Sequence, residues 1–187
     1  MDAFEHAYCG TPPAAVAERA ARIGALALDV DGVLTDGGVY ISGDGEPFKR
    51  FNIHDGKGIA MLREAGIAVA IVTARRSGAV EARARELRIE HVHQGVRDKA
   101  TALAGLADAL GLATESCAFV GDDLVDLAPM RTAGLAVAVA NAHPAVCAIA
   151  HWVTRRGGGD GAVREVCELL LGARGALRPW LSDDARA

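Results

Sequence analysis

Short apolar runs alternate along the chain with charged segments in which apolar residues recur at helical spacing. The apolar runs are about six residues or shorter, the length of strands that are covered on both faces of a parallel sheet. This alternation predicts an α/β fold, a mainly parallel Rossmann-like sheet with helices on both faces. The predicted strands span 25–30, 67–72, 90–93, 117–120 and 135–139, and the predicted helices span 13–23, 58–65, 78–87, 99–110, 124–132, 145–150 and 162–171.

One segment interrupts the alternation. Residues 39–42 and 47–53 alternate around the sequence GDGE and predict a small β-hairpin, at about 38–53, in place of a cap domain. The hairpin is too short to be a domain, so we expect a single domain over residues 1–187. Because a hairpin alone is marginally stable, its apolar side chains are expected to pack on a partner, with their own domain as the alternative. These side chains are Val39, Tyr40, Ile41, Phe48 and Phe51.

The last part of the chain, about 157–187, is expected to be a tail, and its glycine run at 157–161 is expected to let it bend.

The composition of the chain excludes several classes of function but says little about the fold. The net charge is −4 with 24% charged residues, which disfavours a nucleic-acid binder. No apolar run approaches the roughly 18 residues of a membrane span, and the first ten residues lack the pattern of a signal peptide. Four cysteines (Cys9, Cys117, Cys147 and Cys167) show no CxxC spacing, so we expect reduced thiols in a cytoplasmic protein.

Carboxylates gather where two of the predicted strands end. Asp29 and Asp31 follow the first buried strand, and Asp122, Asp123 and Asp126 follow a later one. In parallel sheets these strand ends border the ligand crevice, so the acids are expected to converge there. Burial and mutual repulsion penalise such a group unless a cation is present, and oxygen ligands suit Mg²⁺. The ordinary alternatives are a loop or helix cap for DVD and a helix N-cap for GDDLVD.

Taken in order, DVDG at 29–32, Thr73, Lys99 and GDDLVD at 121–126 resemble the four motifs of the haloacid dehalogenase superfamily. More narrowly, the chain resembles the capless 3-deoxy-D-manno-octulosonate 8-phosphate phosphatases from about residue 8 to 171. The narrower resemblance rests on DVDGVLTDG, GE..K.FN..DG.GI, QG..DK, GL.VAVA.AHP and GG.GAVREVC.LLL.

The resemblance implies a phosphatase of lipopolysaccharide precursor synthesis that works through an aspartyl-phosphate. Asp29 would be the nucleophile, and Asp31 would first protonate the leaving group and then activate water. Thr73 and Lys99 would contact the phosphoryl oxygens.

The resemblance also implies a metal site. Mg²⁺ would be held by Asp29, by the main-chain carbonyl of Asp31 and by Asp122. Asp123 and Asp126 would support these ligands from behind.

For the substrate, the resemblance implies contacts from Asp31, Lys99, Arg75, Arg83 and the loop Asn52, Ile53, His54, Asp55 and Gly56. Arginine suits a planar carboxylate, as in a sugar acid. The alternative for Arg83 is the solvated face of helix 78–87. The resemblance further implies a homotetramer in which hairpins pack together, with the C-terminal segment reaching toward a neighbour's active site.

Three positions depart from the family pattern: Ala74, Arg88 and Ala60. Arg88 stands where a glycine is usual and favours, as an alternative, a phosphatase of nine-carbon sugar acid 9-phosphates. A second alternative is a non-catalytic tetramerisation module like those joined to sialic-acid cytidylyltransferases, although such modules usually lack one of the four motifs. A signalling receiver domain also uses acids, Thr and Lys, but it lacks a carboxylate at the position of Asp31.

Overall fold

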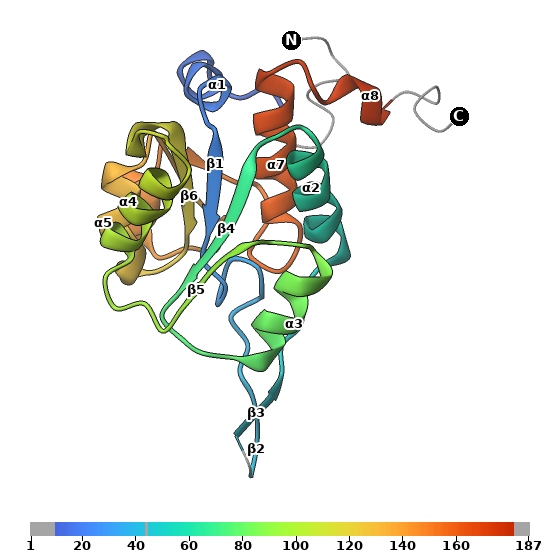
Figure 1. The fold of residues 1–187 in the computed structure, drawn as a ribbon, viewed down its shortest axis with the longest axis vertical. Coiled ribbons are helices and arrows are strands. Elements are labelled where there is room, and N and C mark those ends of the chain that lie inside the picture. The colour runs from blue at the N-terminus through green and yellow to red at the C-terminus, as the bar shows by residue number, and fades with distance from the viewer. Residues whose placement is uncertain (1–9, 44, 182–187) are drawn as a thin grey trace.

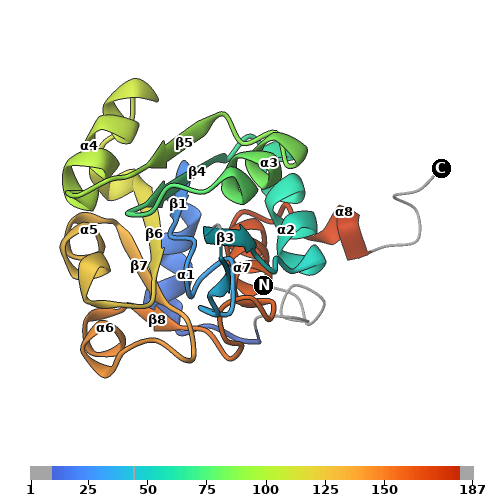
Figure 2. The ribbon, with the colours of Figure 1, turned by 90° about the horizontal axis from the view of Figure 1, so that it is seen from below.

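Six parallel strands form one sheet in the order β5-β4-β1-β6-β7-β8 (Figures 1 and 2). The structure is a computed structural model that describes residues 10–43 and 45–181. All five predicted strands are present within a few residues of their expected bounds, and a sixth, β8, was too short to predict. The strands are β1 (Ala25–Leu28), β4 (Ala68–Thr73), β5 (His91–Gln94), β6 (Cys117–Gly121), β7 (Leu135–Ala138) and β8 (Trp152–Val153).

Helices cover both faces of this sheet, as predicted. On β1, Leu26 and Leu28 point into a core shared with α1 (Ala14–Ala21), α2 (Ile53–Glu64), α3 (Gly78–Glu86) and α7 (Ala162–Ala173). Ala25 and Ala27 point the other way, toward α4 (Lys99–Ala109), α5 (Leu127–Thr132) and α6 (Pro144–Ile149). The alternation of side chains along a strand therefore divides the interior into two cores, one on each face.

The hairpin β2 (Tyr40–Ser42) and β3 (Gly45–Phe48) leaves the loop after β1 and projects beyond the carboxyl edge of the sheet (Figures 1 and 2). Tyr40 stacks on Phe48 with ring centroids 4.8 Å apart, yet Phe48 is 56% exposed and Ile41 75% exposed. Phe51 differs from the rest of the predicted apolar set because it packs on the core of its own domain. The second strand ends at Phe48, so the prediction that it continues to residue 53 is wrong.

Helix α2 begins five residues before its predicted start at 58, so the expected loop at 52–56 is wrong. Asn52 caps the helix, and its side-chain oxygen accepts a hydrogen bond from His54 N at 2.8 Å. Two glycines in the first turns hid the helical pattern. Gly58 is needed for packing, because a Cβ there would lie 3.0 Å from the Cβ of Cys167 on α7.

The glycine run at 157–161 is a docked loop, which corrects the expectation that it lets a tail bend. Gly159 N donates to Val33 O at 3.0 Å, and a Cβ on Gly158 would come within 1.7 Å of Gly32 O. The helix that follows, α7, is buried along most of its length. Only the segment after α7, with the short α8 (Arg178–Leu181), can be called a tail.

Smaller differences concern helix ends and connections. The helix predicted at 124–132 is a 3-10 turn, η3 (Leu124–Asp126), followed by α5, and a second such turn, η2 (Thr114–Ser116), precedes β6. Cys117, Cys147 and Cys167 are free thiols, as predicted, and Cys9 lies outside the described residues. Over residues 10–43 and 45–181, no helix combines the length and the apolar character needed to cross a membrane.

Candidate active site

The sheet register brings the predicted motif residues to one edge. Leu28 at the end of β1 pairs with Ile71 of β4 and Val120 of β6. Asp29 and Asp122 therefore follow their strands, and Thr73 ends the adjacent one, at the carboxyl edge. Asp29 N donates to Val120 O at 3.1 Å. Thr73 is only 2% exposed, and its hydroxyl accepts a hydrogen bond from Arg75 N at 3.4 Å.

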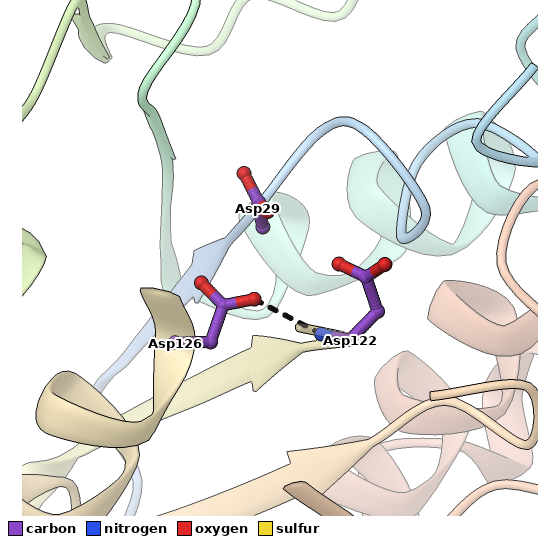
Figure 3. Close-up of side chains that lie close together, drawn as sticks. All are labelled: Asp29, Asp122 and Asp126. Carbon is purple, nitrogen blue, oxygen red and sulfur yellow. Dashed lines mark hydrogen bonds between the residues drawn. The ribbon is translucent and has the colours of Figure 1, made fainter. Parts of the chain in front are cut away.

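Three of the carboxylates meet at this edge. Asp29, Asp122 and Asp126 each offer an oxygen within 4.8 Å of the others (Figure 3). Burial, with repulsion from Asp126, raises the pKa of Asp29 to about 6, although Lys99 opposes the shift. Burial raises the pKa of Asp122 to about 7, with repulsion from Asp29, Asp126 and Asp123 adding to the effect. In the absence of a further cation, both acids therefore keep their protons to a higher pH than an ordinary aspartate does.

Lys99 supplies the one ammonium group that reaches these acids among the ion pairs of the described residues. It is the first residue of α4, whose N-cap Asp98 accepts a hydrogen bond from Thr101 N at 3.0 Å. Its Nζ lies 2.9 Å from Asp29 Oδ2 and 2.7 Å from Asp126 Oδ1. Burial opposes the charge on Lys99, but the two carboxylates outweigh it and the pKa of Lys99 is raised.

Asp126 and Asp123 hold the GDD turn in shape. Asp126 Oδ2 accepts from Asp122 N at 3.0 Å (Figure 3, dashed) and from Asp123 N at 3.3 Å. Asp123 is exposed and caps η3 by accepting from Leu124 N at 2.7 Å. Gly121 is required because a Cβ there would lie 2.4 Å from that of Asp126. The cap predicted as the ordinary alternative for this motif is thus present together with the acid cluster.

The remaining acids fit a divalent cation. Asp126 is engaged with Lys99 and with two amides, whereas Asp122 Oδ1 is buried and has no hydrogen-bond partner among the described residues. A hard cation between Asp29 and Asp122 would satisfy that oxygen and favour the ionised form of both acids, which burial and nearby carboxylates disfavour. The donor set is all oxygen, which suits Mg²⁺.

Asp31 lies on the loop after β1 and pairs with a lysine that the sequence did not single out. Lys49 Nζ lies 2.5 Å from Asp31 Oδ1, and the Lys49 side chain is only 3% exposed. Lys49 returns from the hairpin, and the next residue, Arg50, pairs with Asp36 at 3.2 Å. The sequence could have indicated Lys49, because it is the lysine of GE..K.FN, one of the segments on which the family resemblance rests.

Known proteins match this chain over almost all of its described length. A family model for haloacid dehalogenase-like hydrolases matches residues 88–165. The 3-deoxy-D-manno-octulosonate 8-phosphate phosphatase of Escherichia coli K12 is 48% identical over 168 residues, which are 90% of this chain and 89% of that protein. The chain belongs to the 3-deoxy-D-manno-octulosonate 8-phosphate phosphatase family.

Solved structures of that family superpose closely. The Yersinia pestis phosphatase has a TM-score of 0.89 at 47% identity, covering 91% of this chain and 92% of its own. The Moraxella catarrhalis phosphatase, crystallised with a magnesium ion, a phosphate ion and a KDO molecule, has a TM-score of 0.86 at 42% identity. That match covers 88% of this chain and 95% of the Moraxella chain. The superfamily and the narrower family predicted from the motifs are therefore both confirmed.

The residues expected to contact a substrate divide into two groups. Asn52, Ile53 and His54 open α2 at the carboxyl edge, where Ile53 is 77% exposed. Asp55 is 1% exposed, and its Oδ1 accepts a hydrogen bond from Arg164 N at 2.8 Å. Its side chain is turned toward α7, which corrects its expected place in a substrate loop. Gly56 is buried as well, and a Cβ there would lie 2.4 Å from Arg83 Nη2.

The two arginines expected to contact the substrate lie in different surroundings, Arg83 largely buried and Arg75 exposed. Arg83 Nη2 donates to Asn52 O at 3.1 Å and Nη1 pairs with Glu86 at 2.8 Å, so this largely buried guanidinium braces the start of α2. The alternative of a fully solvated face is wrong for Arg83. Arg75 is exposed in the loop after β4, beside Thr73.

Arg88 precedes β5 and therefore lies at the amino edge of the sheet, away from Asp29, Asp122 and Asp126 of its own chain. Its φ of +53° explains why a glycine is usual there.

Proposed function

We propose that this chain hydrolyses 3-deoxy-D-manno-octulosonate 8-phosphate to the free sugar acid and inorganic phosphate, with Mg²⁺ as cofactor. The observation that carries the proposal is the buried Asp29, set 2.9 Å from Lys99 beside Asp122 in a chain 48% identical to phosphatases named for this reaction. The step belongs to lipopolysaccharide precursor synthesis.

In the first half of the reaction, an Asp29 oxygen attacks phosphorus and the bond from phosphorus to the sugar oxygen breaks. Asp31 gives a proton to the departing alkoxide, which leaves as the sugar alcohol. The Lys99 ammonium and the Thr73 hydroxyl stabilise charge on the phosphoryl oxygens. When bound to Asp29, Asp122 and the Asp31 main-chain carbonyl, Mg²⁺ neutralises charge at this edge.

In the second half, water attacks the phosphorus of the aspartyl-phosphate on Asp29. Asp31, now a carboxylate, takes a proton from that water, and the bond between Asp29 and phosphorus breaks. The products are inorganic phosphate and the original Asp29 carboxylate. Asp126 keeps Lys99 and the GDD turn in place through both halves.

The sugar acid requires a cation for its carboxylate as well as a phosphate site. Arg75 is suited to that role, because it is an exposed residue whose amide N contacts the Thr73 hydroxyl at the active edge. Asn52, Ile53 and His54 border the same edge, and Arg83 holds them in position through the Asn52 carbonyl. Arg88 gives little support to the nine-carbon alternative, because it lies at the amino edge of the sheet, opposite the active edge of its own chain.

The hairpin supports assembly of several copies of the chain. Val39, Tyr40, Ile41 and Phe48 are between 38% and 75% exposed, although a two-stranded hairpin gains little stability alone. We expect further copies to cover these side chains in a homotetramer whose neighbours complete each active site. Ile41→Asp should lower the mass measured by light scattering, whereas Ser77→Asp, at the start of α3, should leave it unchanged. A wild-type monomer would contradict the assembly.

A substrate panel tests the activity. With Mg²⁺, the eight-carbon acid phosphate should be hydrolysed at least about 10-fold faster, by kcat/KM, than a nine-carbon acid 9-phosphate or p-nitrophenyl phosphate, the scale of one lost or misplaced contact. Asp29→Asn serves as the inactive control. A preference for the nine-carbon substrate would overturn the eight-carbon assignment, and no phosphate release from any substrate would favour the non-catalytic module.

A further inference from the structure

We propose that Lys49 is a positioning residue that holds Asp31, the acid and base of the reaction, in its working orientation. The inference deepens the proposed function, because it concerns how the proton reaches the leaving oxygen. The pair joins the residue just after the hairpin to the catalytic loop, and its two members are 18 residues apart in the chain.

Burial shows that Lys49 is held at this position. Its side chain is 3% exposed, whereas that of Asp31 is 27% exposed. A lysine normally keeps its ammonium group in water, and burying that charge is costly unless a carboxylate lies against it. The Asp31 carboxylate, with its Oδ1 2.5 Å from Nζ, supplies that compensation.

The backbone next to Lys49 is fixed to the same region. Arg50 pairs with Asp36 at 3.2 Å, and Asn52 Nδ2 donates to Gly159 O at 3.3 Å. The segment from 49 to 52 is therefore tied to the loop after β1 and to the docked glycine loop. The backbone that carries Lys49 is therefore fixed, so the Lys49 side chain can restrain Asp31.

Lys99 and Lys49 therefore contact the two different catalytic acids. Lys99 contacts Asp29, which forms the bond to phosphorus, and Lys49 contacts Asp31, which moves the protons. A carboxyl group anchored through one oxygen keeps its other oxygen for proton exchange. Without the anchor, the partly exposed Asp31 side chain would spread over several rotamers, and poorly oriented proton transfer is slow.

The experiment separates the proton-dependent steps from the attack on phosphorus. In the Mg²⁺-loaded enzyme, Lys49→Met should lower kcat by about 10- to 100-fold on an alkyl phosphate, with KM changed less than about 3-fold, because full general acid catalysis contributes about 10²- to 10⁴-fold. p-Nitrophenolate leaves without a proton, so the first-turnover burst with p-nitrophenyl phosphate should keep its wild-type rate. Lys49→Arg should restore most of the lost kcat.

Controls keep the test decisive. Arg131→Met removes an exposed cation on α5, near Ser116 at the amino edge of the sheet, and should leave kcat within about 2-fold. Thermal melts show whether Lys49→Met is folded. If it is not, the conservative Lys49→Gln takes its place. In an Asp31→Asn background, Lys49→Met should slow the reaction no further, because the two residues act through one carboxylate.

An equal loss in the nitrophenyl burst, or a rise in KM at constant kcat, would overturn the positioning role and make Lys49 a substrate contact. A further loss in the Asp31→Asn background would overturn it as well. The comparison uses whichever alkyl phosphate the wild-type enzyme turns over fastest. A wrong sugar acid therefore defeats only the proposed function, and an unchanged Lys49→Met defeats only this inference.

Discussion

Among the acids that the structure describes, one group lies at the active edge of the sheet and another lies between two helices, and only the first group is suited to chemistry. The edge acids are Asp29, Asp122 and Asp126, and the interhelical acids are Asp55 and Glu168, between α2 and α7. Burial does not distinguish the groups, since Asp29 is 5% and Asp55 is 1% exposed. The pKa of a single acid does not distinguish them either, because burial raises that of Asp55 to about 6, as it does that of Asp29.

The difference lies in what each acid faces. Arg164 contacts one oxygen of each interhelical acid, with its amide N 2.8 Å from Asp55 Oδ1 and its Nε 2.6 Å from Glu168 Oε1. The other oxygen of each acid, Asp55 Oδ2 and Glu168 Oε2, has no hydrogen-bond partner among the described residues. The edge acids face one another and share Lys99, so repulsion adds to burial at Asp122. Unrelieved repulsion between neighbouring acids, rather than burial alone, therefore marks the reactive site.

The sharpest test compares two isosteric changes. Asp29→Asn should abolish phosphate release and leave a folded protein, because it removes the nucleophile without changing its shape. Asp55→Asn should keep kcat within about 3-fold, since the side chain points away from the edge. It should destabilise the fold by about 1–2 kcal/mol through the weakened cap of α7. Phosphate assays and urea unfolding measure both effects, and a folded but inactive Asp55→Asn would remove the distinction between the two groups.

The cations of the two groups form a second matched pair. Lys99→Met should lower kcat by about 10²- to 10³-fold, the scale of one lost transition-state donor, and leave Asp29 and Asp126 unpaired. Arg164→Met should leave kcat nearly unchanged but cost about 1–3 kcal/mol of stability, because Glu168 stays buried without its partner. A loss of activity in Arg164→Met that exceeds its loss of folded protein would contradict the assignment.

Without metal, the stability of the folded protein should depend on pH through both groups of acids, and added metal should remove the contribution of the edge acids. The folded-state pKa values of Asp29, Asp122 and Asp55 lie near 6, 7 and 6, above the ordinary 3.8. The folded protein therefore binds these protons more tightly than the unfolded chain, and the metal-free protein should lose stability as pH rises from about 5 to 7.5.

Mg²⁺ should restore most of that stability. At 100 times its dissociation constant it contributes about 2.7 kcal/mol, a rise in Tm of roughly 5–10 °C for a chain of this size. The slope that persists in Mg²⁺ should belong mainly to Asp55 and to Glu165, whose pKa burial also raises, and it should become shallower in Asp55→Asn. Melting curves at several pH values check both statements, and a metal-free protein whose Tm is constant across this range would contradict them.

The smallest expected effect lies far from both groups. Arg88→Gly should stabilise the fold by about 0.5–1 kcal/mol, because the left-handed φ of +53° suits glycine. Arg85→Gly, inside α3, should instead cost about 1 kcal/mol. Both variants should keep wild-type kcat and substrate preference. A change in preference between eight- and nine-carbon acids in Arg88→Gly would show that Arg88 acts across a subunit boundary.

The sequence predicted the features that depend on local pattern. The buried strands were evident from their apolar runs, and parallel pairing then fixed the meeting of Asp29, Thr73 and Asp122 at one edge. Family motifs added Lys99. The features missed depend on distant partners. Asp55 turns toward a helix that begins at residue 162, and Lys49 reaches Asp31 only because of where the hairpin returns.

The central place of β1 in the sheet has a consequence for biosynthesis. The ribosome releases the nucleophile strand early, but one of its neighbours, β6, begins only at residue 117, and the glycines that back the catalytic loop come at 158 and 159. The emerging chain therefore carries its nucleophile long before it has an active site. A chain that ends before those glycines should therefore release no phosphate, although it already carries Asp29 and Asp31.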